Sequence, residues 1–171
     1  DPLNLNAHAA VLLDGDTGRI LYGKNEKKVL PMASTTKIMT CIIALEYGNL
    51  SDTVTASQNA AAQPKVHLGV YKGQTFRLED LLYSLMLESH NDSAVAVAEH
   101  IGGSAEGFAE KMNRKAREIG CKNVCFVTPN GLDVADEDGN EHSASAADMA
   151  RIMRYCAFQS PCRETFLEIT R

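Results

Sequence analysis

The stretch PMASTTKIMT (31–40), which continues as CIIALEYGN (41–49), decides much of the fold. Its apolar-rich part, IMTCIIAL (38–45), is interrupted by Thr40 and is shorter than the roughly 18 apolar residues of a membrane span. A buried helix fits this run better. We therefore predict a helix from about Ser34 to Tyr47, ended by Gly48 and Asn49.

Ser34 and Lys37 stand three residues apart at the start of this helix, and the pair has two interpretations. Residues at this spacing share a helix face, so the Lys37 amine can reach the Ser34 hydroxyl. A desolvated, neutral lysine can then act as a base, and the helix N-terminus favours a nucleophile placed there. Alternatively, Ser34 only caps the helix and Lys37 is solvated. The pair alone does not decide between an acyl-transfer site and a cap.

A serine-lysine enzyme also needs a polar group that passes the proton to the leaving amine, and a Ser-x-Asn element can do this. Ser89-His90-Asn91 follows the apolar segment LLYSLMLE and precedes another helix, so it is expected near the core. The alternative role of Ser89 and Asn91 is to cap the next helix. A second such element, Ser57-Gln58-Asn59, lies in a polar, alanine-rich segment and is expected at the surface. His90 is expected to be exposed, which disfavours a Ser-His triad.

The composition excludes several other functions. Hydrophobic residues make up 44% and charged residues 23% of the 171 residues, as in ordinary globular domains. The net charge is −5, tryptophan is absent and the basic residues are scattered, so nucleic-acid binding is not expected. Five cysteines are an odd number, and neither a catalytic thiol nor a zinc site is indicated, because activating neighbours and ligand spacing are missing. No metal or other cofactor is expected.

Outward from the central helix, the chain predicts one hairpin and several more helices. AAVLLD (9–14) and RILYGK (19–24) flank GDTG and read as an antiparallel hairpin, whereas residues 50–74 read mainly as loop. The last predicted helix starts at Ser145, with Met149, Ile152, Met153 and Cys156 as its buried stripe. The other predicted helices cover residues 78–88, follow a cap at Asp92, and run from Ser104 to Ile119.

A two-stranded ribbon is marginal alone and needs further strands or a covering layer. The helices can cover one face, but both ribbon edges would stay open. Either the fold is mostly helical, or strands of this sheet lie outside the given sequence.

Three elements in order resemble those of the serine-type D-alanyl-D-alanine carboxypeptidases, the low-molecular-mass penicillin-binding proteins. These elements are MASTTKIMTCIIALE, LLYSLMLESHNDSAVAVAEHI and FVTPNGLD followed by EHSASAADMA. The resemblance covers nearly the whole chain. It implies a β-lactamase/transpeptidase-like α/β fold, with a helical block and an antiparallel sheet of which only the N-terminal hairpin is evident here. It also implies that residues 1–171 form one penicillin-recognising domain, incomplete at its C-terminal end.

The resemblance assigns a role to each candidate residue. Ser34 would attack the carbonyl of the penultimate D-alanine in a peptidoglycan stem peptide, with Lys37 as its base. Ser89 would relay the proton to the departing D-alanine, and Asn91 would hold the substrate backbone. β-Lactams would acylate the same serine and leave slowly. The implied location is extracytoplasmic, either secreted or on the outer face of the cytoplasmic membrane. The opening DPLNLNAHAA, with neither an initiator methionine nor a signal segment, reads as a mature or trimmed form.

One departure from the family pattern is evident. The family carries a Lys-Thr-Gly element on a strand that lines the site, and the lysines after Ser89 (Lys111, Lys115, Lys122) are not followed by Thr-Gly or Ser-Gly. We expect a second polypeptide or a further segment to supply this strand. Two alternatives stay open. The first is a β-lactamase of the same superfamily, for which Glu164 and Glu168 are unconvincing deacylating residues. The second is a catalytically silent peptidoglycan-binding domain.

Overall fold

The computed structural model describes residues 3–171, and its centre is the helix predicted around IMTCIIAL. Helix α1 spans Thr36–Tyr47, and a short 3-10 turn, η1 (Ala33–Thr35), leads into it. Most side chains of α1 are buried, including those of Met39, Cys41, Ile42 and Ile43. A helix that is apolar on nearly every side becomes the middle of a helical block. The prediction of a buried helix is confirmed, but Ser34 lies in the preceding turn.

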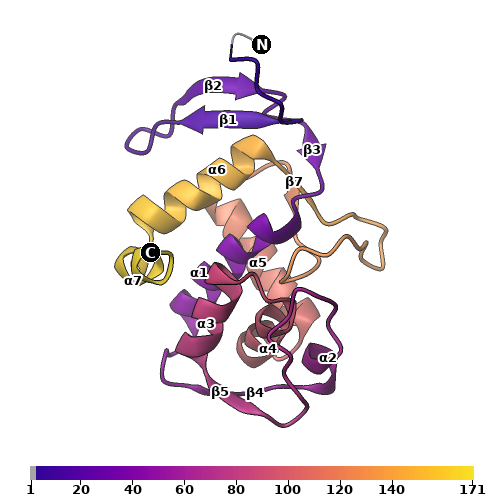
Figure 1. Ribbon diagram of the computed structural model, residues 1–171. Helices are drawn as coiled ribbons and strands as arrows, with labels where there is room; N and C mark the ends of the chain where they lie inside the picture. Colours follow the sequence, from indigo (N-terminus) through magenta and orange to yellow (C-terminus); the bar gives the residue numbers. More distant parts are fainter. Residues whose placement is uncertain (1–2) are drawn as a thin grey trace.

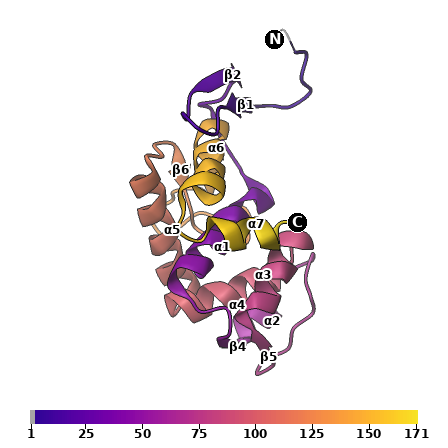
Figure 2. The same cartoon turned by 90° about the vertical axis from the view of Figure 1, so that its left-hand side faces the viewer.

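The other helices surround α1 (Figures 1 and 2). The predicted helices are present: α3 (Leu78–Leu87), α4 (Asn91–Gly102), α5 (Ala105–Ile119) and α6 (Ala146–Arg154). Ser104 and Ser145 cap α5 and α6, since each hydroxyl accepts a hydrogen bond from the backbone N–H three residues on. The structure adds elements that the sequence did not indicate: α2 (Gln58–Ala61), a π-helical turn η2 (Tyr155–Gln159) and α7 (Arg163–Ile169).

The strands form small antiparallel sheets rather than one hairpin alone. β1 (Ala10–Leu13) and β2 (Ile20–Lys24) make the predicted hairpin, which lies across α6 at one end of the molecule (Figure 1). β7 (Ser143–Ser145) pairs with both β3 (Val29–Leu30) and β6 (Val124–Cys125). β4 (Thr53–Thr55) and β5 (Thr75–Arg77) pair at the opposite end. The observed architecture is therefore α/β, with helices and antiparallel ribbons as predicted.

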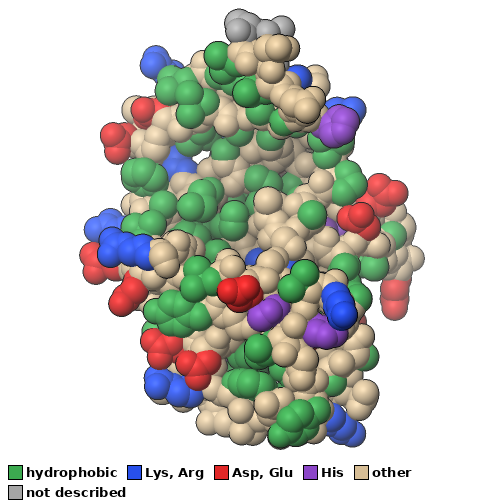
Figure 3. Space-filling view, viewed as in Figure 1, with side chains coloured by type: hydrophobic (Ala, Val, Ile, Leu, Met, Phe, Trp, Pro, Cys, Tyr) green, Lys and Arg blue, Asp and Glu red, His purple; other side chains and the backbone are tan. Residues whose placement is uncertain are grey.

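The hairpin presents apolar side chains to solvent. Leu12 and Leu21 are 56% and 51% exposed, and Figure 3 shows hydrophobic side chains gathered over this end of the molecule. A ribbon with such a face needs a further layer or further strands to exclude water from it. No helix in the described part of the chain combines the length and the apolar character needed to cross a lipid bilayer.

Three local predictions were wrong. Asp92 is not the N-cap of α4, because it lies within the first turn after His90, and its carboxylate accepts hydrogen bonds from the backbone of residues 68–70 as well as from Ser93. Met153 is 39% exposed and does not belong to the buried stripe of α6. His90 is half-buried rather than exposed, and its Nδ1 lies 2.8 Å from the Ser84 hydroxyl. For Asp92 and His90, a side-chain hydrogen bond outside the predicted local pattern accounts for the difference.

Candidate active site

Ser34 and Lys37 meet at the entrance to α1. Ser34 lies in the 3-10 turn η1 and is exposed, whereas Lys37, in the first turn of α1, is only 2% exposed. The Lys37 Nζ lies 3.1 Å from the Ser34 Oγ. An exposed hydroxyl in contact with a buried amine matches the geometry of a nucleophile beside its base.

The surroundings of the Lys37 amine favour its neutral form. Besides Ser34, Nζ donates to the Asn91 Oδ1 at 3.0 Å and to the Asn130 carbonyl oxygen at 2.8 Å, and both acceptors are uncharged. Burial lowers the pKa of Lys37 from 10.5 to about 8. A neutral amine has two N–H bonds and one lone pair. With Asn91 and Asn130 as its acceptors, the lone pair is left to receive the proton of Ser34.

Asn91 begins α4 and is held on both sides of its amide. Its Oδ1 accepts from Lys37, and its Nδ2 donates to the Pro64 carbonyl at 3.1 Å, which leaves one N–H of that group unassigned. Its backbone N–H donates to the Val66 carbonyl at 2.8 Å. The structure therefore brings Asn91 together with Ser34 and Lys37, and within residues 3–171 one amide N–H makes no hydrogen bond and can donate to another acceptor.

Ser89 lies just before α4, in the left-handed region with φ 60°, and is half-buried. Among the described residues, its hydroxyl makes no hydrogen bond to Ser34 or Lys37. A positive φ at a residue other than glycine is uncommon and often accompanies a functional constraint. His90 bonds to Ser84 instead of joining Ser34 or Lys37. The other Ser-x-Asn element, Ser57–Asn59, caps and begins α2.

The loop 127–132 completes the surroundings of Lys37. The Asn130 carbonyl accepts from Lys37, and the Pro129 carbonyl accepts from the Thr40 hydroxyl at 2.6 Å. Gly131 has φ 92°, and a Cβ added to it would overlap the backbone of Ala33. Glycine is therefore required at this position on two grounds, its backbone conformation and its contact with the Ala33–Ser34 turn.

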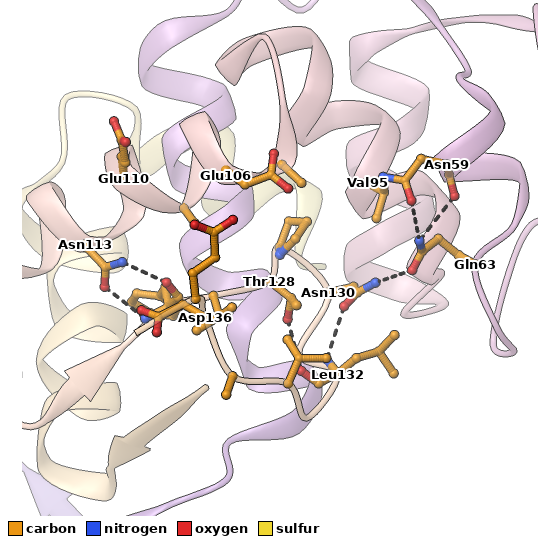
Figure 4. Close-up of a pocket in the computed structure, with 18 residues that line it drawn as sticks. Asn59, Gln63, Val95, Glu106, Glu110, Asn113, Thr128, Asn130, Leu132 and Asp136 are labelled. Atoms are coloured by element: carbon orange, nitrogen blue, oxygen red, sulfur yellow. Dashed lines mark hydrogen bonds between the residues drawn. The ribbon is translucent and has the colours of Figure 1, made fainter. Parts of the chain in front are cut away.

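Asn130 also connects this loop to a cavity on its other side. Its side-chain Nδ2 donates to the Gln63 Oε1 at 2.8 Å, and its Oδ1 accepts from the Leu132 backbone N–H. Figure 4 shows both contacts at the edge of a cavity of about 600 Å³. The side-chain amide and the main-chain carbonyl of Asn130 thus face different surroundings. Through these two groups, Asn130 bonds to both Gln63 and Lys37.

The Asp92 carboxylate binds the backbone of the segment whose Pro64 and Val66 carbonyls accept from Asn91. Its buried carboxylate accepts from the backbone N–H groups of Leu68, Gly69 and Val70 at 2.8–3.1 Å. Burial alone would raise the pKa of Asp92, but these hydrogen bonds lower it below its ordinary value. The Asp92 carboxylate therefore stays ionised. Its hydrogen bonds hold the segment that contains Pro64 and Val66 against the start of α4.

Residues 1–169 match the family model described as D-alanyl-D-alanine carboxypeptidase. The chain belongs to this family. The D-alanyl-D-alanine carboxypeptidase DacF of Bacillus subtilis (strain 168) is 42% identical over 149 residues, covering 84% of this chain and 37% of that protein. The D-alanyl-D-alanine endopeptidase of Pseudomonas aeruginosa is 31% identical over 152 residues, covering 87% of this chain and 47% of that protein.

Solved structures of a D-alanyl-D-alanine carboxypeptidase and of a penicillin-binding protein show the same fold. The D-alanyl-D-alanine carboxypeptidase DacD from Francisella tularensis has a TM-score of 0.87 at 29% identity, over 98% of this chain and 40% of that chain. Penicillin-binding protein D2 from Listeria monocytogenes, in its cefotaxime-bound form, has a TM-score of 0.79 at 26% identity, over 92% of this chain and 64% of that chain. The fold predicted from the resemblance is thus confirmed as that of the penicillin-binding proteins.

The chain spans well under two thirds of the length of the curated relatives given above. No Lys-Thr-Gly element occurs in its 171 residues.

Proposed function

We propose that this chain is the larger, N-terminal part of a serine D-Ala-D-Ala carboxypeptidase that removes the terminal D-alanine of peptidoglycan stem peptides. One observation carries the proposal: the exposed Ser34 hydroxyl lies 3.1 Å from the amine of the buried Lys37. Because the two other acceptors of that amine are uncharged, its neutral form is accessible near neutral pH. The family assignment supplies the substrate class.

In the proposed reaction, the Ser34 Oγ attacks the carbonyl carbon of the penultimate D-alanine while its proton passes to the Lys37 Nζ. The peptide C–N bond then breaks, and Ser89 relays a proton to the departing amine of the terminal D-alanine. Asn91 offers its remaining amide N–H to the substrate backbone. Water hydrolyses the ester on Ser34, which releases the shortened peptide and restores the hydroxyl.

The complete site would need a further strand. We propose that residues 1–171 are one penicillin-recognising domain that lacks its C-terminal part. A second polypeptide or an additional segment would then supply a Lys-Thr-Gly strand for the substrate carboxylate. The exposed hairpin, with Leu12 and Leu21, offers a sheet to which such a strand could add. The same strand would bring an oxyanion-hole amide, and loss of one such donor typically costs about 100- to 1000-fold in rate.

Carboxypeptidase activity is favoured over endopeptidase activity by the higher identity to the named carboxypeptidase, 42% against 31%. A β-lactamase is disfavoured, because Glu164 and Glu168 both lie on the exposed side of helix α7. Within the described part of the chain, neither bonds to Ser34 or Lys37. β-Lactams would act as covalent inhibitors, which agrees with the cefotaxime- and ampicillin-bound forms of the Listeria protein. Such an enzyme would work outside the cytoplasm, in cell-wall and cell-shape maintenance.

Intact-mass spectrometry of the purified protein, before and after exposure to benzylpenicillin, tests the proposal. We expect a penicilloyl adduct that peptide mapping places on Ser34 and that Ser34→Ala abolishes. A companion polypeptide in the same spectrum would account for the missing strand. Rapid loss of the adduct with turnover of the drug would indicate a β-lactamase. An unmodified Ser34 in a folded protein that still binds muropeptides would indicate the silent binding domain.

A further inference from the structure

His142 lies just before β7, within the family-like segment EHSASAADMA but with none of the catalytic roles assigned above, and its side chain is only 2% exposed. Its Nδ1 accepts hydrogen bonds from the backbone N–H groups of Val127 and Thr128, at 2.9 and 3.2 Å. A nitrogen that accepts from two donors carries no proton. The ring is therefore the neutral tautomer with its proton on Nε2.

The other ring nitrogen faces the turn of the nucleophile. The His142 Nε2 lies 2.7 Å from the hydroxyl of Thr36, a residue with no exposed surface. The Thr36 hydroxyl donates its single proton to the Ala33 carbonyl oxygen at 2.7 Å, so it can only accept from His142. His142 consequently donates to the Thr36 hydroxyl, and that hydroxyl donates to the Ala33 carbonyl. We name this arrangement the Thr36–His142 link.

The residue that the link holds is conformationally unusual. Ala33 has φ 48°, a left-handed backbone conformation that is unfavourable for an L-residue relative to the ordinary helical region. Such a conformation persists only where the surroundings determine it. The Ala33 carbonyl is fixed by Thr36 on one side and contacted by Gly131 on the other. The peptide unit that contains this carbonyl leads directly into Ser34, so its orientation sets the direction of the Ser34 side chain.

The Thr36–His142 link also involves the loop whose carbonyl accepts a hydrogen bond from Lys37, the proposed base. The two backbone groups that anchor His142 belong to the loop 127–132, whose Asn130 carbonyl accepts from Lys37. One imidazole ring therefore connects the turn that carries Ser34 with the loop that orients Lys37. Burial lowers the pKa of His142 to about 4, against the opposing field of Asp133, so the ring stays neutral at physiological pH.

We propose that His142 is a positioning residue for acyl transfer, which fixes the Ser34 turn through the Thr36 hydroxyl without touching the substrate. This inference rests on the proposed function, since it assigns a mechanical role in the same reaction. A displacement of the nucleophile by about 1 Å can cost on the order of 100-fold in rate. The link should therefore affect the acylation step and leave the initial, non-covalent binding of a β-lactam nearly unchanged.

Three variants test the link. Thr36→Val keeps the shape of the side chain and removes the hydroxyl, whereas Thr36→Ser keeps the hydroxyl and serves as the matched control. His142→Asn places an amide oxygen close to the position of Nδ1, which preserves an acceptor for the loop while the contact to Thr36 is lost. The measurements are the rate constant for benzylpenicillin acylation at saturation, the concentration for half-saturation, and the urea midpoint that reports folding.

We expect Thr36→Val and His142→Asn each to slow acylation by about 10- to 100-fold with little change in half-saturation. Thr36→Ser should stay within about threefold of the unsubstituted protein. The double variant Thr36→Val/His142→Asn should be no slower than either single variant, because both remove the same link. ¹⁵N NMR of the imidazole should show the proton on Nε2 between pH 5 and 9.

Unchanged acylation in folded Thr36→Val and His142→Asn would overturn the inference, as would additive losses in the double variant. A proton on Nδ1 would also overturn it, independently of activity. Failure of the unsubstituted protein to be acylated would instead overturn the proposed function. The two failures are thus distinguishable.

Discussion

Gly131 provides a sharp test of how the Ala33–Ser34 turn is held in place. A Cβ at this position would overlap the carbonyl group of Ala33 and lie 3.0 Å from the Ser34 backbone nitrogen. Gly139 is a matched control, because its φ of 81° is close to the 92° of Gly131, yet a Cβ there would meet nothing within 4 Å. Both glycines lie outside helices and strands, so alanine has the same backbone effect at each.

The size of the effect follows from this comparison. Alanine at positive φ costs roughly 1–2 kcal/mol, partly offset by about 0.4–1 kcal/mol because alanine restricts the unfolded chain. Gly139→Ala should therefore lower the free energy of unfolding by about 1 kcal/mol. Gly131→Ala adds a clash with main-chain atoms, for which overpacking suggests about 1–3 kcal/mol more. The total loss for Gly131→Ala is then about 2–4 kcal/mol.

Function should separate the two variants more clearly than stability does. Relief of the clash in Gly131→Ala must move the Ala33–Ser34 turn or the loop that holds Asn130, and either shift disturbs the contact between Ser34 and Lys37. We expect benzylpenicillin acylation to fall by on the order of 100-fold in Gly131→Ala and to stay near its original rate in Gly139→Ala. Urea unfolding and time-resolved intact mass measure both quantities. Equal losses of stability in the two variants, together with equal acylation rates, would refute the reasoning.

Three further predictions concern ionisable groups. Because burial lowers the pKa of Lys37 to about 8, the rate constant for acylation should rise about tenfold from pH 6 to 7 and level off above about pH 8. Stopped-flow rates whose pH midpoint lies near the ordinary lysine value of 10.5 would contradict this prediction. Asp92→Asn weakens the hydrogen bonds that the Asp92 carboxylate accepts from several backbone N–H groups, and it should lower the free energy of unfolding by about 2 kcal/mol. The same change at the exposed Asp80 should cost less than about 1 kcal/mol. Similar urea midpoints for the two variants would exclude a stabilising role for the Asp92 hydrogen bonds. Because burial lowers the pKa of His142 from 6.5 to about 4, the unfolded chain binds the extra proton between these values. The free energy of unfolding should therefore fall as pH drops from about 6.5 towards 4, by at most about 3 kcal/mol, and His142→Asn should show a shallower fall; parallel pH curves would contradict the assignment.

The local elements could be derived from sequence because their causes are short-range. The apolar run 38–45 requires a buried helix, Ser104 and Ser145 supply N-terminal caps, and the two runs around GDTG form a hairpin. In the same way, the spacing of Ser34 and Lys37 places the hydroxyl and the amine within reach of each other. Errors arose where a local pattern had a competing tertiary partner, as for Asp92, whose carboxylate binds the backbone of a distant loop in addition to that of Ser93 in its own helix.

By itself, then, the sequence determined the helical block, the hairpin, the pairing of Ser34 with Lys37 and, through three ordered elements, the family. Tertiary structure alone decided what surrounds Lys37 and what holds Ser34. The Asn130 carbonyl is 93 residues away from Lys37 along the chain, and His142 is 106 residues away from Thr36. The acceptor for Lys37 is a main-chain carbonyl, which every residue carries, so no side-chain pattern marks it. The protonation state of Lys37 and the tautomer of His142 depend on burial and on directed hydrogen bonds, which exist only once the helices and the loop 127–132 are packed together.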